Sequence, residues 1–337
     1  MSIHTALILF LVFALVIALA GFRLVRYADK LADITGIGEA LFGAILLGAI
    51  TSLAGITTSV TAATQNYPQL AISNAMGGIA AQTFFLALAD LVYRKANLEH
   101  ASASLTNLLQ GLLLIFMLSF VMLVVYSPEV SIWGIHPASV LLLLIYFFGT
   151  RLIDKAKNAP MWYPLTTKET VKDVPEQENI RSTNVRALWV KFVLLALVVG
   201  FSGYVVARTG IVIASSTGMS EGLVGSLFTA IVTSFPELIV TIAATRQRAL
   251  TLAVGNIIGG NTFDILFVSF SDFAYRPGSI FHAIGQEQIY VIVITLIMVA
   301  TLIGGLLIRE RQGIGKIGWE SALIILFFVM GYLILYL

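Results

Sequence analysis

Long apolar stretches separated by short polar segments run along the whole chain. A helix that crosses a bilayer needs roughly 20 apolar residues, and ten stretches reach or approach that length. They predict transmembrane helices near residues 5–25, 38–64, 70–93, 103–126, 135–152, 187–207, 222–246, 250–273, 287–308 and 317–337. We therefore expect an all-α polytopic membrane protein with ten transmembrane helices.

The second half of the chain repeats the first at a constant offset, so that position n matches position n + 182. Thr51-Ser52 returns as Thr233-Ser234, and Asn74 returns as Asn256. The other matches at this repeat offset include Thr35-Gly36 with Thr217-Gly218, Arg26 with Arg208, Gly77-Gly78 with Gly259-Gly260, and Asp90 and Arg94 with Asp272 and Arg276. Solenoid repeats recur every 20 to 50 residues or so, whereas a duplicated half in an apolar chain is typical of transporters.

Five helices in each half imply that the second half starts on the opposite face of the membrane. We therefore predict two inverted five-helix repeats, at residues 1–153 and 187–337, which a linker loop at 154–186 joins. The linker carries mixed charges and several prolines. At this length it is too short for a folded sensor domain, which usually needs about 50 residues or more.

Composition agrees with a membrane protein and excludes several other classes. The chain is 58% hydrophobic and 11% charged, with a mean hydropathy of +0.94, whereas soluble domains are about 45–50% apolar and about 25% charged. It has no cysteine, which excludes disulfides, thiolate metal sites and cysteine nucleophiles. The formal charge of +2 does not indicate nucleic acid, because the basic residues are sorted by membrane side.

Alternate loops of the predicted topology contain 18 of the 20 Lys and Arg residues. The remaining loops keep only Arg208 and Arg276. Cytoplasmic loops of membrane proteins carry an excess of Lys and Arg. We therefore expect a multi-pass protein of the plasma or bacterial inner membrane, with both termini outside and the central loop in the cytoplasm.

Two acidic residues lie well inside predicted spans, Glu237 in the seventh and Asp264 in the eighth. Charges inside a bilayer are costly, so such residues are functional candidates by default. Hydroxyls and amides accompany them in the same segments, namely Thr233, Ser234, Asn256 and Asn261. Oxygen ligands without His or Cys suit Ca²⁺, Na⁺ or Mg²⁺ rather than a transition metal. We predict Glu237 and Asp264 as the metal ligands.

Structural interpretations of the same residues stay open. Glu237 could be protonated and hydrogen-bonded between helices, and Asn74 and Asn256 could form interhelical hydrogen bonds. Asp272 lies four residues before Arg276, a spacing that predicts a local ion pair at a helix end. Pro236 removes an amide donor and can free backbone oxygens one turn earlier, and Gly259-Gly260 allows a close backbone approach or local unwinding.

The segment Thr233-Ser234-Phe235-Pro236-Glu237, followed by Gly255-Asn256-Ile257-Ile258-Gly259-Gly260-Asn261, resembles the second α-repeat of the calcium/cation antiporter superfamily. That superfamily includes the sodium/calcium exchangers, and its motifs read G-T-S-x-P-E and G-N-x-x-G-S-N. The resemblance implies exchange of Ca²⁺ against Na⁺ or H⁺ by alternating access, with the ions bound between two α-repeats. It also implies the ion ligands of the second repeat, namely Thr233, Ser234, Glu237, Asn256, Asn261 and Asp264.

The first repeat departs from that pattern. Gly55 takes the position of Glu237, and Gln82 takes that of Asp264. The polar candidates that remain in this repeat are Thr51, Ser52, Asn74 and Gln82. Because one carboxylate of the usual pair is missing, exchange of Na⁺ or K⁺ against H⁺ is the alternative function.

Two further functions are less favoured, a non-transporting membrane scaffold and an intramembrane aspartyl protease. The Gly-x-Gly-Asp signature of such a protease is absent before Asp264. We expect no enzyme, no catalytic residues, no cofactor and no nucleic-acid partner. The expected partners are the lipid bilayer and inorganic cations, and the oligomeric state is left open.

Overall fold

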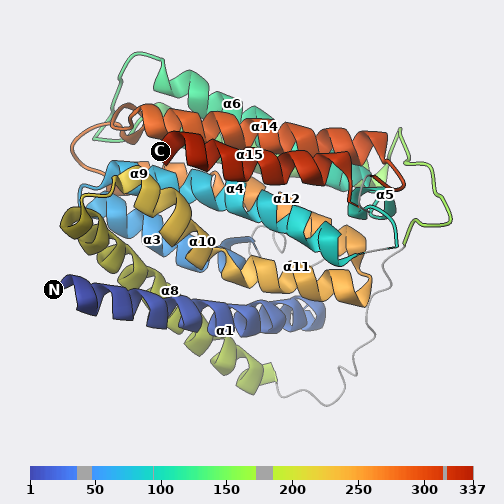
Figure 1. Ribbon diagram of the computed structural model, residues 1–337, viewed down its shortest axis with the longest axis horizontal. Helices are drawn as coiled ribbons and strands as arrows, with labels where there is room; N and C mark the ends of the chain where they lie inside the picture. Colours follow the sequence, from blue (N-terminus) through green and yellow to red (C-terminus); the bar gives the residue numbers. More distant parts are fainter. Residues whose placement is uncertain (36–47, 94, 172–184, 314–316, 337) are drawn as a thin grey trace.

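The computed structural model describes residues 1–35, 48–93, 95–171, 185–313 and 317–336. Within these ranges the regular structure is helical, apart from one isolated β-bridge between Ile132 and Ile135. The all-α class is therefore confirmed, and Figure 1 shows long helices running roughly parallel along the longest axis of the molecule.

The helices of the first half follow the predicted spans closely. They are α1 (Ile3–Thr35), α3 (Leu53–Thr64), α4 (Pro68–Val92), the short α5 (Leu98–Ala101), α6 (Leu105–Val125) and α7 (Pro137–Asn158). The predicted span 38–64 lies partly outside the described residues, because the description resumes at residue 48.

The helices of the second half include several short and broken elements. They are α8 (Val185–Thr217), α9 (Glu221–Leu223), the π-helical η3 (Val224–Thr229), α10 (Ala230–Thr233), α11 (Phe235–Gln247), α12 (Leu250–Asp264), α13 (Phe267–Ala274), the 3₁₀-helix η4 (Ile280–His282), α14 (Gln286–Ile308) and α15 (Trp319–Tyr336).

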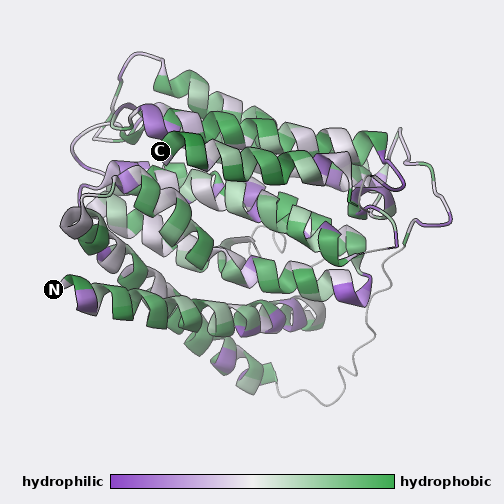
Figure 2. Cartoon of the chain, viewed as in Figure 1, coloured by the Kyte–Doolittle hydropathy of each residue, from purple (hydrophilic) through white to green (hydrophobic). Residues whose placement is uncertain are grey.

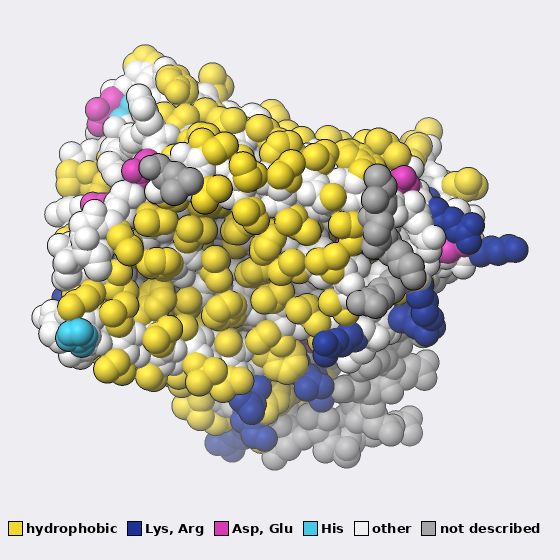
Figure 3. All heavy atoms as spheres, in the orientation of Figure 1, with side chains coloured by type: hydrophobic (Ala, Val, Ile, Leu, Met, Phe, Trp, Pro, Cys, Tyr) yellow, Lys and Arg dark blue, Asp and Glu magenta, His cyan; other side chains and the backbone are white. Residues whose placement is uncertain are grey.

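Eight helical segments in the described residues are long and apolar enough to cross a membrane, and the bent run from α9 to α11 would make nine. The count of ten stays a prediction, since the second span is only partly described. Figure 3 shows a broad hydrophobic band across the molecule, with the basic side chains visible on this face gathered mainly at the right-hand end and along the lower edge. This division is typical of a membrane protein.

The most buried helices lie in a central layer. In their most apolar windows, 78% of the residues of α4 and 72% of those of the α12–α13 span are buried, against 28% for α8. Figure 1 shows α3, α4 and α9–α12 between a layer of α1 and α8 and a layer of α6, α14 and α15. Isolated hydrophilic positions in this apolar central layer (Figure 2) therefore cannot reach lipid or bulk water easily.

The helix that carries Glu237 is bent beside Pro236, the residue that was expected from the sequence to free backbone oxygens. The segments Glu221–Thr233 and Phe235–Gln247 meet at 47°, and Pro236 lies in the first turn of α11, where it has no amide hydrogen to donate. Ser234, at the bend, has φ −96° and ψ 5°. Ser52, its equivalent at the repeat offset, has φ −89° and ψ 9° directly before α3. Both repeats thus interrupt the helix at the same serine, although only the second has a proline.

Two buried aspartates hold the ends of several helices together. Arg94, the predicted ion-pair partner of Asp90, lies outside the described residues. Asp90 accepts hydrogen bonds from the backbone amides of Leu98 (2.7 Å) and Gly318 (3.0 Å). Asp272 accepts them from the amides of Ile280 (3.0 Å) and His136 (2.8 Å). At the repeat offset Leu98 corresponds to Ile280, and His136 corresponds to Gly318. These contacts therefore recur with the two halves of the chain exchanged.

Candidate functional site

The central layer contains a hydrogen-bonded cluster around Asp264, at the end of α12. Its Oδ1 accepts a bond from Ser52 Oγ (2.5 Å), and its Oδ2 accepts one from Gln82 Nε2 (2.6 Å). Gln82 Nε2 also lies 3.4 Å from Ser234 Oγ. All four side chains are at most 3% exposed. The cluster joins the two halves, because Ser52 corresponds to Ser234 and Gln82 to Asp264 at the repeat offset.

Glu237 lies in the first turn of α11, beside this cluster. Its side chain is 3% exposed, and Asp264 lies close enough to act on it electrostatically. Its Oε2 is buried with no hydrogen-bond donor, and so are Gln82 Oε1 and Asn261 Oδ1. Buried polar atoms are normally satisfied. Unpaired oxygens beside two buried carboxyl groups therefore suit a bound proton or a hard cation.

The side-chain amides predicted as ligands differ in how many of their atoms form hydrogen bonds. Asn74 Nδ2 donates to Ser59 Oγ (2.9 Å) and to the Gly55 carbonyl (3.3 Å), and its Oδ1 accepts from Thr229 Oγ1 (2.7 Å). These bonds agree with the structural interpretation of Asn74. The oxygen of Asn261, by contrast, stays open, since its amide nitrogen is the atom that bonds, to Thr83 Oγ1.

Asn256 repeats the arrangement of Asn74 in a weaker form. Its Nδ2 lies 3.3 Å from Thr241 Oγ1, and Thr241 corresponds at the repeat offset to Ser59, the partner of Asn74. The sequence interpretation did not single out Ser59 and Thr241. Extending the repeat alignment to buried hydroxyls would have found them, because the two positions are polar in both halves.

The two predicted threonine ligands bond to their own helices. Thr51 Oγ1 donates to the Gly48 carbonyl (3.0 Å), and Thr233 Oγ1 donates to the Ala230 carbonyl (3.2 Å). Such a bond leaves the lone pairs of each hydroxyl oxygen available. Among the described residues, no three or more His, Cys, Asp and Glu side chains form a metal cage. Any cation here would depend on amide, hydroxyl and backbone oxygens as well as the two carboxyls.

At Gly55, where the first repeat lacks a carboxylate, an aromatic side chain fills the space. A Cβ atom at Gly55 would lie only 2.5 Å from the ring of Phe267, which is 3% exposed and begins α13. The aromatic ring therefore fills the space that a side chain at position 55 would enter. The site is asymmetric, with its two carboxyl groups both in the second half.

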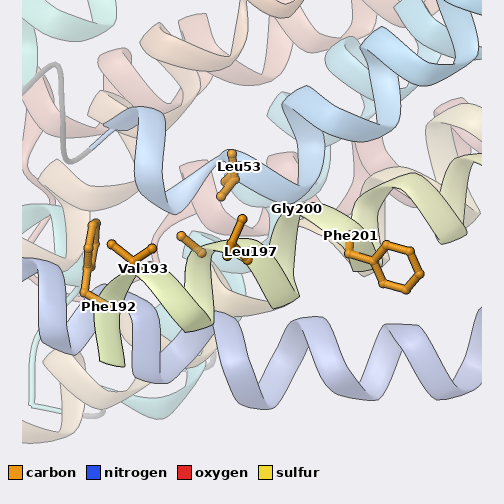
Figure 4. Close-up of a pocket in the computed structure, with 7 residues that line it drawn as sticks. Leu53, Phe192, Val193, Leu197, Gly200 and Phe201 are labelled. Carbon is orange, nitrogen blue, oxygen red and sulfur yellow. The ribbon is translucent and has the colours of Figure 1, made fainter. Parts of the chain in front are cut away.

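The described cavity lies elsewhere. It has a volume of about 460 Å³ and is lined by side chains of α3 and α8, among them Leu53, Phe192 and Phe201 (Figure 4). Its walls are apolar, and none of the candidate ion ligands lines it.

Known proteins resemble this chain along most of its length. It is 29% identical over 282 residues to the inner membrane protein YrbG of Escherichia coli (strain K12), which covers 83% of this chain and 82% of YrbG. It is 29% identical over 142 residues to the sodium/calcium exchanger MaX1 of Methanosarcina acetivorans, covering 42% of this chain and 38% of MaX1.

The fold is also that of a solved exchanger. The crystal structure of the H⁺/Ca²⁺ exchanger CAX matches with a TM-score of 0.70 at 16% identity, covering 97% of this chain and 82% of that one. The model of the family described as sodium/calcium exchanger protein matches residues 5–152 and 186–337. Because both halves match, the chain belongs to the sodium/calcium exchanger family, a family of membrane antiporters.

Proposed function

We propose that this protein exchanges Ca²⁺ against Na⁺ or H⁺ by alternating access, through a central site between α3, α4, α11 and α12. The observation that carries the proposal is the pair of hydrogen bonds that Asp264 accepts from the first half of the chain. A buried carboxyl group on α12 is hydrogen-bonded by Ser52 and Gln82 of the other half, beside the open oxygen of Glu237.

These two hydrogen bonds on Asp264 suggest how ion binding couples to a change of conformation. A cation that binds the oxygens of Asp264 draws electron density from them, so it weakens the hydrogen bonds that they accept from Ser52 and Gln82. Those two hydrogen bonds connect the first half of the chain to the second, so loading the site weakens one connection between the halves. A ligand can shift a conformational equilibrium only through such differential contacts.

Charge supports Glu237 and Asp264 as the principal ligands. An uncompensated charge in a low-dielectric site costs several kcal/mol even after relaxation. A Ca²⁺ ion therefore needs about two negative charges, and these two residues are the carboxyls of the described central cluster. Asn261, Gln82, Ser52 and Ser234 would contribute neutral oxygens.

A second candidate is exchange of Na⁺ or K⁺ against H⁺. The observation that favours it is Phe267, whose ring occupies the space beside Gly55. Two Pro-Glu motifs would provide one more carboxyl group than this chain has. Of the two acids that remain, Glu237 and Asp264, one would carry the proton and the other would bind the monovalent ion.

Flux measurements in proteoliposomes distinguish the two candidates. We expect Ca²⁺ uptake that requires an outward Na⁺ gradient or a pH gradient. Na⁺ or K⁺ exchange for H⁺ with no Ca²⁺ uptake would replace the first candidate by the second. No cation flux under any gradient would contradict both.

A further inference from the structure

A second pair of buried carboxyl groups lies outside the central site, where α5 and α15 begin. Glu99 of α5 is 1% exposed, and Glu320, in the first turn of α15, is fully buried. Figure 1 shows α5 and the start of α15 at the same end of the molecule. Asp90, which joins this junction, follows Gln82 by eight residues, about 12 Å along α4.

Glu99 and Glu320 are brought together by Asp90, because its carboxylate accepts the amides of Leu98, directly before Glu99, and Gly318, two residues before Glu320. Each of the two acids acts electrostatically on the other. No described residue donates a hydrogen bond to any of their four carboxyl oxygens. An ionised carboxylate can only accept hydrogen bonds, whereas a protonated one can donate. Two ionised groups at this junction would repel each other in a buried place, and a single proton between them turns the repulsion into a hydrogen bond.

Among the described residues, the other charged groups of the junction do not neutralise the pair. Asp90 on α4 and Glu310 after α14 add negative charge. His100, the next residue of α5, bonds to the Arg309 carbonyl and to Thr167. The Arg309 guanidinium donates to Leu165, His100 and Thr170. Burial, with the nearby charges of Asp90 and Glu320, raises the pKa of Glu99 well above its ordinary value.

The duplicated half of the chain provides an internal comparison. At the repeat offset, Glu99 corresponds to Phe281 and Glu320 corresponds to Ala138. Both junctions are held by an aspartate that accepts equivalent backbone amides. An apolar pair therefore serves the same architecture at the other end of the molecule. The two acids are a property of this junction and are not required by the fold.

Local packing makes room for the acidic pair. A Cβ atom at Gly305 of α14, or at Gly318 before α15, would collide with the Glu320 side chain. The position that corresponds to Gly305 in the first half is Leu123. The glycine thus admits the side chain of Glu320 into a site that excludes water.

We propose that Glu99 and Glu320 form a proton-binding site, in which one shared proton ties α5 to α15. Loss of that proton leaves two negative charges buried together and loosens the junction. The existence of this proton site does not depend on the proposed function. Any effect of the site on cation exchange rests on the proposed function.

The test compares Glu99→Gln and Glu320→Gln with the unmodified protein, each purified in detergent. A pKa that is raised in the folded state means that folding is favoured at low pH, and that this stability is lost as pH rises toward the raised pKa. Both variants should match the unmodified protein at acidic pH and melt at a higher temperature than it does at alkaline pH. Infrared spectra should lose one protonated-carboxyl band in each variant.

The matched control replaces the two acids by the residues at the equivalent positions of the other junction. The Glu99→Phe, Glu320→Ala double variant should fold and lose the alkaline drop in melting temperature. Identical pH profiles in the unmodified protein and both glutamine variants would overturn the proposal.

A bound cation is the competing occupant. If Ca²⁺ or Na⁺ stabilises Glu237→Gln but not the Glu237→Gln, Glu99→Gln double variant, the pair holds a metal ion and the proton site is wrong. If the melting profiles behave as expected while no exchange is found, the proposed function fails and the proton site stands.

Discussion

At the scale of single residues, the two central carboxyl groups have different surroundings. Both oxygens of Asp264 accept hydrogen bonds from the first half. Glu237 instead has a buried oxygen with no donor. Glu237 therefore has an unshared oxygen for an ion, whereas each oxygen of Asp264 is already shared with a donor of the first half.

We expect Glu237→Gln to reduce Ca²⁺ exchange in proteoliposomes to background. The amide keeps the size of the side chain and removes the charge that offsets the ion. A loss of at least about tenfold, equivalent to about 1.4 kcal/mol, is the minimum for a direct ligand. The variant Glu129→Gln, at an exposed residue outside both buried acid clusters, controls for the substitution itself. Normal exchange by folded Glu237→Gln protein would sink the assignment of this residue.

Asp264→Asn tests the charge requirement separately. If the protein moves Ca²⁺, this variant should lose Ca²⁺ uptake, because one carboxylate cannot offset a divalent ion. If it moves a monovalent cation, exchange should weaken or become uncoupled while cation binding persists. The new amide also faces the Gln82 donor, so a stability loss of about 1–3 kcal/mol is expected. Asp154→Asn is the matched control, and undiminished Ca²⁺ uptake by Asp264→Asn would show the charge argument to be wrong.

At the scale of elements, α3 and α13 pack so that Phe267 occupies the position of the missing carboxylate. Gly55→Glu alone should therefore destabilise the protein, since the new Cβ would lie 2.5 Å from the ring. Overpacking of this kind costs about 1–3 kcal/mol. With Phe267→Ala in the same chain, the acid should fit and shift ion preference toward divalent cations.

Competition between Ca²⁺ and Na⁺ in flux assays measures that shift. The Gly55→Gln, Phe267→Ala variant has the same shape without the charge. Equal ion preference in the Glu and Gln variants would contradict the expected role of charge at position 55.

At the scale of the whole molecule, the opposite ends carry the loops that test the topology. The segment at Lys168 adjoins α5, since Thr167 bonds to His100. The loop at Pro277 adjoins the other end, where Ser279 bonds to Glu129. Figure 1 shows α5 and the α13–α14 connection at opposite ends, and both termini lie at the second of these.

Cysteine labelling checks the predicted orientation. The chain contains no cysteine, so Lys168→Cys and Pro277→Cys would each be the single reactive residue. We expect a membrane-impermeant reagent to label Pro277→Cys from outside intact cells and Lys168→Cys only after the membrane is opened. Labelling of both from the same side would rule out the predicted arrangement.

The sequence by itself determined most of the helices, the duplication and the two acids within predicted spans, Glu237 and Asp264. Apolar length is a local property of the chain, so most predicted spans coincide with observed helices. The helices α1 and α8 nevertheless end ten residues beyond the spans predicted for them, at Thr35 and Thr217. The bend before Pro236 was also predictable, because proline lacks an amide hydrogen wherever it occurs.

Only the tertiary structure decided the partners of those residues. Asp264 accepts hydrogen bonds from Ser52, 212 positions earlier in the chain, and from Gln82, 182 positions earlier. Equivalent glycines also differ, since a Cβ at Gly77 would collide with the Ser226 backbone while Gly259 has room. Hydrogen bonds and close packing depend on which side chains meet in three dimensions, and the two halves of this chain meet with different side chains.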